Sequence, residues 1–437
     1  MNTQAFMSYT DAIKTLKDSP MFNLSLSSKE LFHSNFLYWI WKVDSNCFKG
    51  IIEALLGEPN LNWGNDWVVS REYKNFDLCV KDRSNEDLEN DDSQGLAKKP
   101  KIYFVLENKV KSIPYKAQLD KYVKKVNEHH GKKIQVDTKY LLLALPSGFP
   151  DEESIRQQGK WVIATYSQYL HTIKNLTIQQ GYKKDILTDY CSFVGALLDV
   201  YNTWNNDCYQ SNSPLLNTQY IADAEKLRIH DLYHKSKYSI ICADLQQKLH
   251  SHISGKVDII DNDDKKIFNT LSANPNKKLI AFGYGYTHGK PFVEVKVAFH
   301  DGHHPVICII QAQGESYCHG IIMNHSMLKV NGTKDMKIWN YIARMVQNSI
   351  FIVNKYDWMR YDNTGVANSP SVIDENLISN SAFGNNSLLY PDSKPYLKFA
   401  GDNSNIGMIY QYRKLDPLVE VGQLIEYIVE DVKRLIR

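Results

Sequence analysis

The stretch KIYFVLENKVKSIPYKAQLDKYV, residues 101–123, decides the fold of the first half of this chain. It begins as an apolar run rich in β-branched and aromatic residues, which predicts a buried strand, and after Pro114 it becomes a lysine-rich helical pattern. Glu107 and Lys109 stand two residues apart near the end of the strand, so their side chains project from the same face. Because buried charges cost free energy unless they are paired or bind something charged, this strand end predicts a functional site.

The flanking patterns predict one α/β domain over residues 1–209, with a central mixed β-sheet flanked by helices. Residues 83–100 are polar and read as an exposed loop between the second and third strands. A short strand entering a helix is expected over 161–175. The other predicted elements are helices at 28–43, 47–57, 115–129 and 184–205, and strands at 66–72, 75–82 and 139–147.

A polar stretch with one proline, residues 210–219, is the predicted linker to a C-terminal α+β domain at 220–437. A helical segment over 220–252 comes first, and residues 278–314 follow as an antiparallel meander with turns at 288–289 and 301–302. Further helices are expected near 335–349 and at 416–436. The pattern leaves the role of this domain open among recognition, regulation and oligomerisation.

Composition excludes several classes of protein. The 437 residues are 43% hydrophobic, which is enough for two or three domains, and the net charge of +2 means that nucleic-acid binding must come from local patches. The seven cysteines form no C-x-x-C pair, which argues against a disulfide framework or a structural zinc module and predicts a cytoplasmic protein. The N-terminal sequence MNTQAFMSYTDAI predicts no signal peptide, and the absence of any apolar run near 18 residues predicts no membrane span.

Two carboxylates are expected on neighbouring strands: Asp77 on the 75–82 strand and Glu107 on the next. Hydrolysis of a phosphodiester needs a divalent cation, and hard oxygen ligands suit Mg²⁺ or Mn²⁺. Lys109, on the same face as Glu107, could orient water or stabilise developing charge, and the backbone carbonyl of Asn108 could add a ligand. Glu-x-Lys also recurs by chance in a chain rich in both residues, so a surface salt bridge is the alternative. The apolar frame around the motif favours the metal site.

Six residues carry a resemblance to a known family: Asp77, Glu107, Asn108, Lys109, Gln118 and Tyr122. Their arrangement resembles the PD-(D/E)XK nuclease superfamily, and HSNFLYWIW…FVLENKV…QLDKY is similar to its prokaryotic branch of uncharacterised or defence-associated nucleases. The resemblance spans roughly residues 25–205 and implies a restriction-endonuclease-like core. Phe76 stands where the motif that names the family has proline.

The resemblance also implies roles for these residues. It makes Asp77 and Glu107 catalytic metal ligands and Lys109 the catalytic lysine. Glu30, in the first turn of the 28–43 helix, corresponds to a helical carboxylate that joins the metal site in some members. The alternative for Glu30 is a favourable position at the positive end of the helix dipole.

Three further residues are expected to contact substrate. Gln118 and Tyr122 match a Gln-x-x-x-Tyr pattern of some family members, and at a spacing of four they share one helical face, from which they could touch phosphate or position the site. An exposed glutamine and a half-buried tyrosine are the alternative. His33 could touch a phosphate, with a packing histidine as the alternative.

The function implied by the resemblance is a Mg²⁺- or Mn²⁺-dependent nuclease, with DNA favoured over RNA as its substrate and defence against foreign DNA as a role. The alternative is a catalytically silent, nuclease-like module for nucleic-acid binding or assembly. Many nucleases that cut both strands of a duplex pair two active sites, so a homodimer is one expectation, and the oligomeric state stays open.

Overall fold

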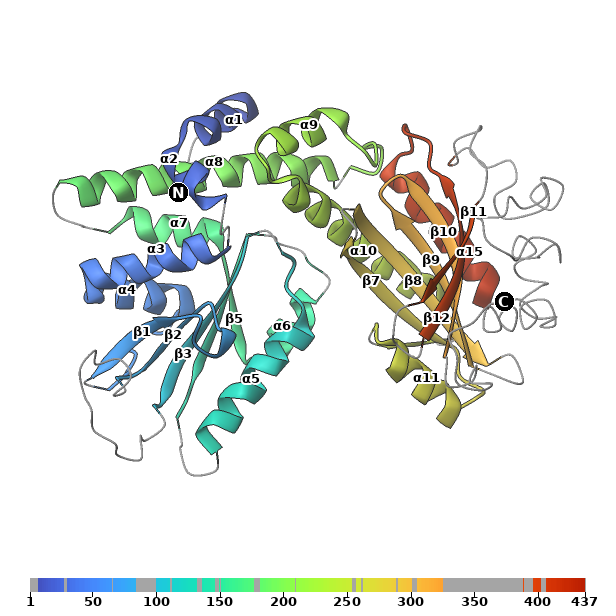
Figure 1. Cartoon of the computed structure of the whole chain (residues 1–437), viewed down its shortest axis with the longest axis horizontal. Coiled ribbons are helices and arrows are strands. Elements are labelled where there is room, and N and C mark those ends of the chain that lie inside the picture. The colour runs from blue at the N-terminus through green and yellow to red at the C-terminus, as the bar shows by residue number, and fades with distance from the viewer. Residues whose placement is uncertain are drawn as a thin grey trace. The chain divides into compact units, whose positions relative to one another are not determined.

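The computed structural model of the chain is shown in Figure 1. It divides into two compact units: unit 1 comprises residues 1–206 and 219–236, and unit 2 comprises residues 207–218 and 237–437. The structure describes residues 7–26, 30–64, 66–83, 100–110, 112–131, 136–145, 149, 151–176, 181–208, 210–253, 257–260, 262–287, 290–300, 305–324, 388, 396–401 and 406–436.

Unit 1 is built on a five-stranded mixed sheet with the strands in chain order. The first three strands pair antiparallel and the last three pair parallel, which confirms the predicted central mixed sheet. The strands are β1 (Trp67–Arg71), β2 (Leu78–Asp82), β3 (Ile102–Lys109), β4 (Lys139–Ala144) and β5 (Trp161–Thr165).

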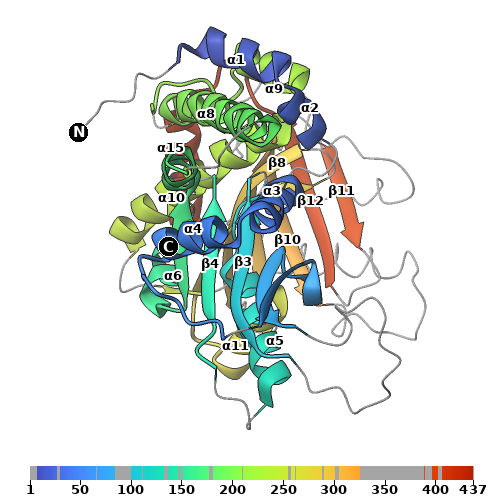
Figure 2. The same cartoon turned by 90° about the vertical axis from the view of Figure 1, so that its left-hand side faces the viewer.

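Helices cover both faces of this sheet. The views of Figures 1 and 2 place α3 and α4 on one face and α5 on the other. The helices of unit 1, with the two that extend from it, are α1 (Tyr9–Asp18), α2 (Pro20–Ser25), α3 (Glu30–Val43), α4 (Ser45–Leu56), the 3₁₀ turn η1 (Tyr73–Asn75), α5 (Lys116–His130), α6 (Glu152–Gln158), α7 (Tyr166–Lys174), α8 (Tyr182–Cys208), α9 (Thr218–Lys226) and α10 (His230–Ile253).

Strand β3 divides its side chains between these two faces because they alternate along a strand. Phe104 and Leu106 join the large apolar core beneath α3, α4, α7 and α8. Glu107 and Lys109 therefore project to the opposite face, and Glu107 meets α5 through Gln118. The apolar pattern of β3 thus fixes which face of the sheet receives the charged pair.

Most elements predicted for the first domain are confirmed to within a few residues. Gly57, with Pro59 two residues beyond it, ends α4 in the left-handed conformation with φ 68°, at the predicted end of the 47–57 helix. The predicted helical segment over 220–252 is confirmed as two helices, α9 and α10, and Arg228 between them has φ 55°. Helices α1, α2 and α6 were not predicted. The predicted loop at 83–100 lies outside the described residues except at its two ends.

Unit 2 contains a seven-stranded sheet in the order β11-β12-β10-β9-β8-β7-β6. The predicted meander is confirmed as β7, β8 and β9, which pair antiparallel, and β10 continues it. The predicted helix at 335–349 and turns at 288–289 and 301–302 lie outside the described residues. The elements of unit 2 are β6 (Asp258–Ile259), α11 (Asp264–Ala273), β7 (Leu279–Thr287), β8 (Lys290–His300), β9 (Pro305–Gln313), β10 (Ser316–Asn324), β11 (Tyr396–Gly401), β12 (Ile406–Lys414) and α15 (Val421–Ile436).

The predicted linker at 210–219 is hydrogen-bonded within unit 2. Leu215 donates its backbone N–H to the carbonyl of Val419, and Val421 donates to the carbonyl of Ser213, at 2.8 and 2.9 Å. The chain therefore passes between the two compact units at residues 206–207, 218–219 and 236–237. The predicted division into functional domains, at residues 209 and 220, stays a prediction. Within the described ranges, no helix has both the length and the apolar composition needed to cross a bilayer.

Candidate active site

The end of β3 presents a buried ion pair toward α5. Glu107 is 2% exposed and Lys109 is 7% exposed. Lys109 Nζ lies 2.8 Å from Glu107 Oε1, and Gln118 of α5 donates its Nε2–H to the same oxygen, also at 2.8 Å. The second oxygen, Glu107 Oε2, is buried and has no hydrogen-bond partner among the described residues. A buried carboxylate oxygen with no partner costs free energy, so it points to a ligand that this side chain is arranged to bind.

Asp77 is held against the same strand end by the hairpin that precedes it. The β1–β2 turn contains η1, and Asp77 stands immediately before β2, where its side chain is half-buried. Its Oδ2 accepts the backbone N–H of Asn108 at 2.7 Å. The structure thus brings Asp77 next to the Glu107–Lys109 segment, as the sequence pattern predicts.

The two carboxylates have unusually high pKa values. Burial and the charge of Asp77 together raise the pKa of Glu107 to about 7, against the lowering effect of Lys109. Burial likewise raises the pKa of Asp77 to about 6, against the lowering effects of the Asn108 N–H and Lys109. Burial alone would lower the pKa of Lys109, but Glu107 and Glu30 outweigh it and the pKa is raised. Neighbouring carboxylates that raise each other's pKa in this way are typical of sites that bind a cation, because the cation stabilises both negative charges.

Glu30 lies close enough to act electrostatically on this pair. It raises the pKa values of both Asp77 and Glu107. Its Oε1 accepts the backbone N–H and the hydroxyl of Ser112 at 2.8 and 2.6 Å. Among the described residues, no three His, Cys, Asp or Glu side chains converge to hold a metal ion together. The fit to a cation therefore rests on Asp77 and Glu107, and the metal-binding role of Glu30 stays a prediction.

Asn108 points to the other face of the sheet and ties the site to its surroundings. Tyr166, the first residue of α7, donates its hydroxyl to Asn108 Oδ1 at 2.6 Å. Asn108 in turn donates Nδ2–H to the carbonyl of Glu30 at 2.9 Å. Both Tyr166 and Asn108 are fully buried. This link between β3, α3 and α7 was not predicted, because a partner 58 positions away leaves no local signal. A metal ligand at the Asn108 carbonyl stays a prediction.

Gln118 and Tyr122 lie on one face of α5, as their spacing predicts. The amide of Gln118 donates to Tyr122 Oη at 3.0 Å as well as to Glu107. The ring of Tyr122 packs edge-on against Phe76, with centroids 5.3 Å apart. These contacts favour a positioning role for both residues around Glu107, and their contact with substrate stays a prediction.

His33 lies in the apolar core of unit 1, the packing position that was the alternative for it, and its contact with substrate stays a prediction. It is 1% exposed, and its Nδ1 lies 2.7 Å from the hydroxyl of Tyr190 on α8. Burial lowers its pKa to about 3, so the ring is neutral at ordinary pH. Stacking on Phe193 completes its environment. The sequence pattern could not separate this outcome from the functional one because the covering helix lies far along the chain.

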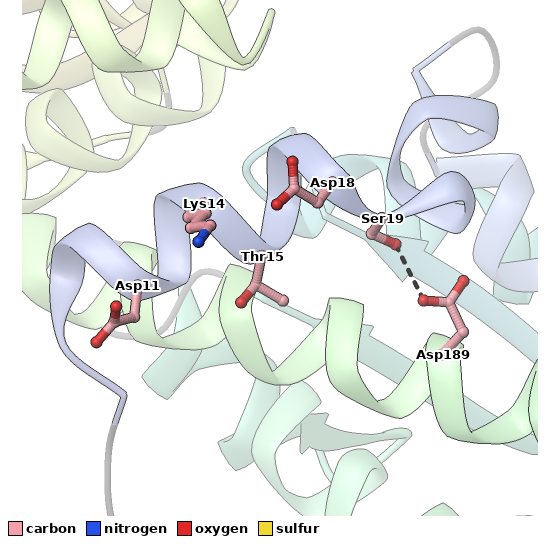
Figure 3. Close-up of a pocket in the computed structure, with 6 residues that line it drawn as sticks. All are labelled: Asp11, Lys14, Thr15, Asp18, Ser19 and Asp189. Atoms are coloured by element: carbon pink, nitrogen blue, oxygen red, sulfur yellow. Dashed lines mark hydrogen bonds between the residues drawn. The ribbon is translucent and has the colours of Figure 1, made fainter.

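An open pocket of about 400 Å³ lies elsewhere on unit 1, between α1 and α8 (Figure 3). One hydrogen bond crosses it, from Ser19 Oγ to Asp189 Oδ1 at 3.4 Å. None of the predicted site residues takes part in it, so we assign it no role in the chemistry. Its lining residues are Asp11, Lys14, Thr15, Asp18, Ser19 and Asp189.

Unit 2 contains a second buried Glu-x-Lys pair, Glu294 and Lys296 on β8, with side chains 3.3 Å apart. Both oxygens of Glu294 are hydrogen-bonded, one to Asn262 at 3.0 Å and the other to Gln311 at 2.9 Å. Lys296 also pairs with Asp264 at 2.9 Å. The charged groups of this cluster all have partners within unit 2, so the cluster has a structural role. Its contrast with Glu107 shows that the free oxygen, rather than the spacing, marks the candidate site.

Comparison with models of protein families matches residues 69–192 to the PD-(D/E)XK nuclease superfamily. This range contains Asp77, Glu107, Lys109 and the Gln118–Tyr122 pair, and it ends before unit 2. Glu30 and His33 lie outside it. No curated protein matches the chain.

Proposed function

We propose that the protein is a divalent-cation-dependent nuclease that hydrolyses phosphodiester bonds, on the premise that residues 69–192 match the PD-(D/E)XK nuclease superfamily. The observation that carries the proposal is the unpartnered Oε2 of Glu107, buried beside Asp77 and Lys109. The family match is independent support for the reaction class.

The residues present fit Mg²⁺ or Mn²⁺. Asp77 and Glu107 offer hard carboxylate oxygens, which these cations prefer. Their raised pKa values mean that the cation would relieve the cost of two neighbouring negative charges. When bound there, such a cation neutralises phosphate charge and lowers the pKa of a bound water. The proposed ligands are therefore these two residues.

Lys109 is proposed to act on the phosphate directly. Its raised pKa keeps the proton on Nζ, so the side chain stays cationic. Glu107 now holds that ammonium at 2.8 Å, and sharing the Glu107 charge with another cation would loosen this hold. The freed ammonium could then stabilise the negative charge that develops on the phosphate oxygens. Gln118 would keep Glu107 in place during this exchange.

DNA is the proposed substrate, with RNA as the alternative. A role in defence against foreign DNA, a cytoplasmic location and action as a homodimer complete the proposal. The resemblance to prokaryotic defence-associated nucleases supports the role in defence. The cysteine pattern supports the cytoplasmic location. The pairing of two active sites to cut both strands supports the homodimer.

A matched pair of substitutions tests the catalytic proposal. Labelled single- and double-stranded DNA and RNA are incubated with Mg²⁺ or Mn²⁺ and the wild type, Glu107→Gln or Glu294→Gln. Each variant neutralises a buried glutamate beside a lysine two residues on, but only Glu107 belongs to the proposed site. We expect Glu107→Gln to lose about 10³-fold in cleavage rate and Glu294→Gln to keep most of it.

Cleavage that survives Glu107→Gln would refute the site. A wild type that binds nucleic acid but cleaves none of the four substrates would refute the enzyme and leave the alternative, a catalytically silent binding module. Equal losses in both variants, with equal losses of folded protein by circular dichroism, would mean that the effect is structural.

A further inference from the structure

Two lysines beside the candidate active site lack an explanation in the fold. Lys74 is exposed in the η1 turn before Asp77, and Lys125 lies on α5. Lys125 Nζ donates to the backbone carbonyl of Lys74 at 3.3 Å, so the two residues are in contact. Within the part of the chain that the structure describes, neither lysine forms an ion pair with a carboxylate.

Aromatic rings support these ammonium groups and connect them to the site. Lys125 Nζ lies 5.6 Å from the centroid of the Tyr122 ring, and Lys74 Nζ lies 5.5 Å from that of Tyr73. Tyr122 accepts a hydrogen bond from Gln118, which also donates to Glu107. A continuous series of contacts therefore runs from the Glu107 carboxylate to the lysine pair.

The turn that carries Lys74 has a strained backbone. Glu72, Lys74 and Asn75 have φ values of 55°, 54° and 65°, a region that non-glycine residues rarely occupy. Hydrogen bonds hold this shape: Asn75 N–H donates to Glu72 O at 3.2 Å, and Phe76 N–H donates to Tyr73 O at 3.0 Å. Strain of this kind concentrates where a segment serves a ligand. Here it fixes Lys74 next to Lys125, and Asp77 two residues beyond the turn.

We propose that Lys74 and Lys125 bind a backbone phosphate of the nucleic-acid strand whose neighbouring phosphate enters the active site. The inference rests on the proposed function, since it requires a nucleic-acid substrate. Lys125 Nζ is held at the backbone carbonyl of Lys74, and among the described residues neither lysine has a carboxylate partner, so a bound phosphate would supply the missing countercharge. The pair also supplies positive charge beside the carboxylates of Asp77 and Glu107, which would otherwise repel a polyanionic strand.

Lys81 adds to the positive charge of this surface. Its Nζ lies 5.2 Å from the centroid of the Tyr73 ring, the same ring that faces Lys74. Lys81 is 2% exposed, so it is assigned no direct contact with phosphate. The contacts with phosphate are therefore assigned to Lys74 and Lys125.

The experiment measures the salt dependence of binding by the full chain. Fluorescently labelled DNA, single-stranded or duplex, is titrated in EDTA, which prevents metal-dependent cleavage, across a series of KCl concentrations. The proteins are the wild type, the double variant Lys74→Gln/Lys125→Gln and the control Lys160→Gln/Lys184→Gln. Both control residues are exposed. Lys184 lies on α8, and Lys160 directly precedes β5, at the opposite end of the parallel strands from Lys109.

Each lost phosphate contact lowers the slope of log K against log salt by about 0.9 for a duplex and about 0.7 for a single strand. Because the two lysines share one phosphate, the double variant should lose about 0.9 from its duplex slope or about 0.7 from its single-strand slope, and roughly tenfold in affinity near 0.1 M salt. The control should match the wild type. If the double variant is poorly folded, Lys74→Ala alone decides the matter, with an expected loss of roughly half of the 0.9 that the shared phosphate contributes to the duplex slope.

The possible failures can be told apart. A wild type that cleaves, with a double variant of unchanged slope and affinity, overturns the lysine pair and leaves the nuclease intact. A wild type that binds without cleaving, with a double variant of reduced slope, overturns catalysis and supports the lysine pair. A wild type that neither binds nor cleaves overturns both.

Discussion

Replacing Asp77 by Asn should stabilise the folded protein at pH 8, although it removes a proposed metal ligand. The reason is that burial raises the pKa of Asp77 to about 6 from an ordinary value of 3.8, so the folded state favours the uncharged carboxyl. Asn is also uncharged, has nearly the same shape, and keeps an oxygen that can accept the N–H of Asn108. The substitution therefore removes the cost of the charge while preserving the 2.7 Å hydrogen bond.

The sign of the effect depends on pH. Below pH 3.8 Asp77 is protonated in both the folded and the unfolded state, so its burial costs no ionisation free energy and the folded state has its full stability. Between pH 3.8 and about 6 the unfolded chain releases the proton while the folded protein retains it, so stability falls as pH rises. Above about pH 6 the loss is constant. The gap between the two pKa values corresponds to about 3 kcal/mol, which solvent screening of a half-buried group reduces to roughly 2 kcal/mol.

Urea unfolding followed by tryptophan fluorescence at pH 4 and pH 8 measures this difference. Without divalent cations, Asp77→Asn should raise the unfolding midpoint at pH 8 by roughly 1 M and change it little at pH 4. Asp18→Asn, at an exposed position on α1, is the control and should leave both midpoints unchanged. A destabilised Asp77→Asn protein at pH 8 would refute the reasoning, because it would mean that the site favours the charged carboxylate even without a cation.

Three further predictions concern the same site. Lys109→Met should destabilise the protein at pH 8 by about 2 kcal/mol and raise the pKa of Glu107 above 7, because the carboxylates lose their countercharge. Urea unfolding at pH 8 and pH 5 measures this loss of stability. Mg²⁺ affinity should increase as pH rises from 6 to 8, with protons released as Asp77 and Glu107 ionise, and calorimetry in buffers of different ionisation enthalpy should detect them. An affinity that does not change with pH would contradict this assignment of ligands. Tyr166→Phe should cost about 1 to 3 kcal/mol, since Asn108 Oδ1 loses its donor, and thermal unfolding should detect the loss.

The residues that could be predicted from sequence are those whose relation is local. Glu107 and Lys109 share a face because a strand alternates, and Gln118 and Tyr122 share one because a helix repeats after nearly four residues. Asp77 could be placed beside Glu107 because a hairpin and the next strand pair in order. These relations depend on backbone geometry that the sequence pattern reports directly.

The residues that could not be predicted depend on contacts across long separations. His33 is buried by Tyr190 and Phe193 of α8, and no pattern near His33 indicates that cover. The contact between Lys74 and Lys125 also joins a turn to a helix 51 residues away. Glu294 shows that a local pattern can also mislead, because its spacing to Lys296 equals that of Glu107 to Lys109. Only the hydrogen-bond partners of the two glutamates, which the sequence does not report, distinguish one pair from the other.

The discontinuity of unit 1 has a consequence for how the protein is made. Residues 219–236 supply apolar side chains to the core of that unit, among them Ala224, Leu227 and Tyr233. During synthesis the core that supports β3 therefore stays incomplete until this segment has left the ribosome. By then residues 207–218 have already emerged, although Ser213 and Leu215 find their partners only at Val421 and Val419, about two hundred residues later. The nuclease-like unit should thus mature before the earliest part of unit 2, even though the two are interleaved along the chain.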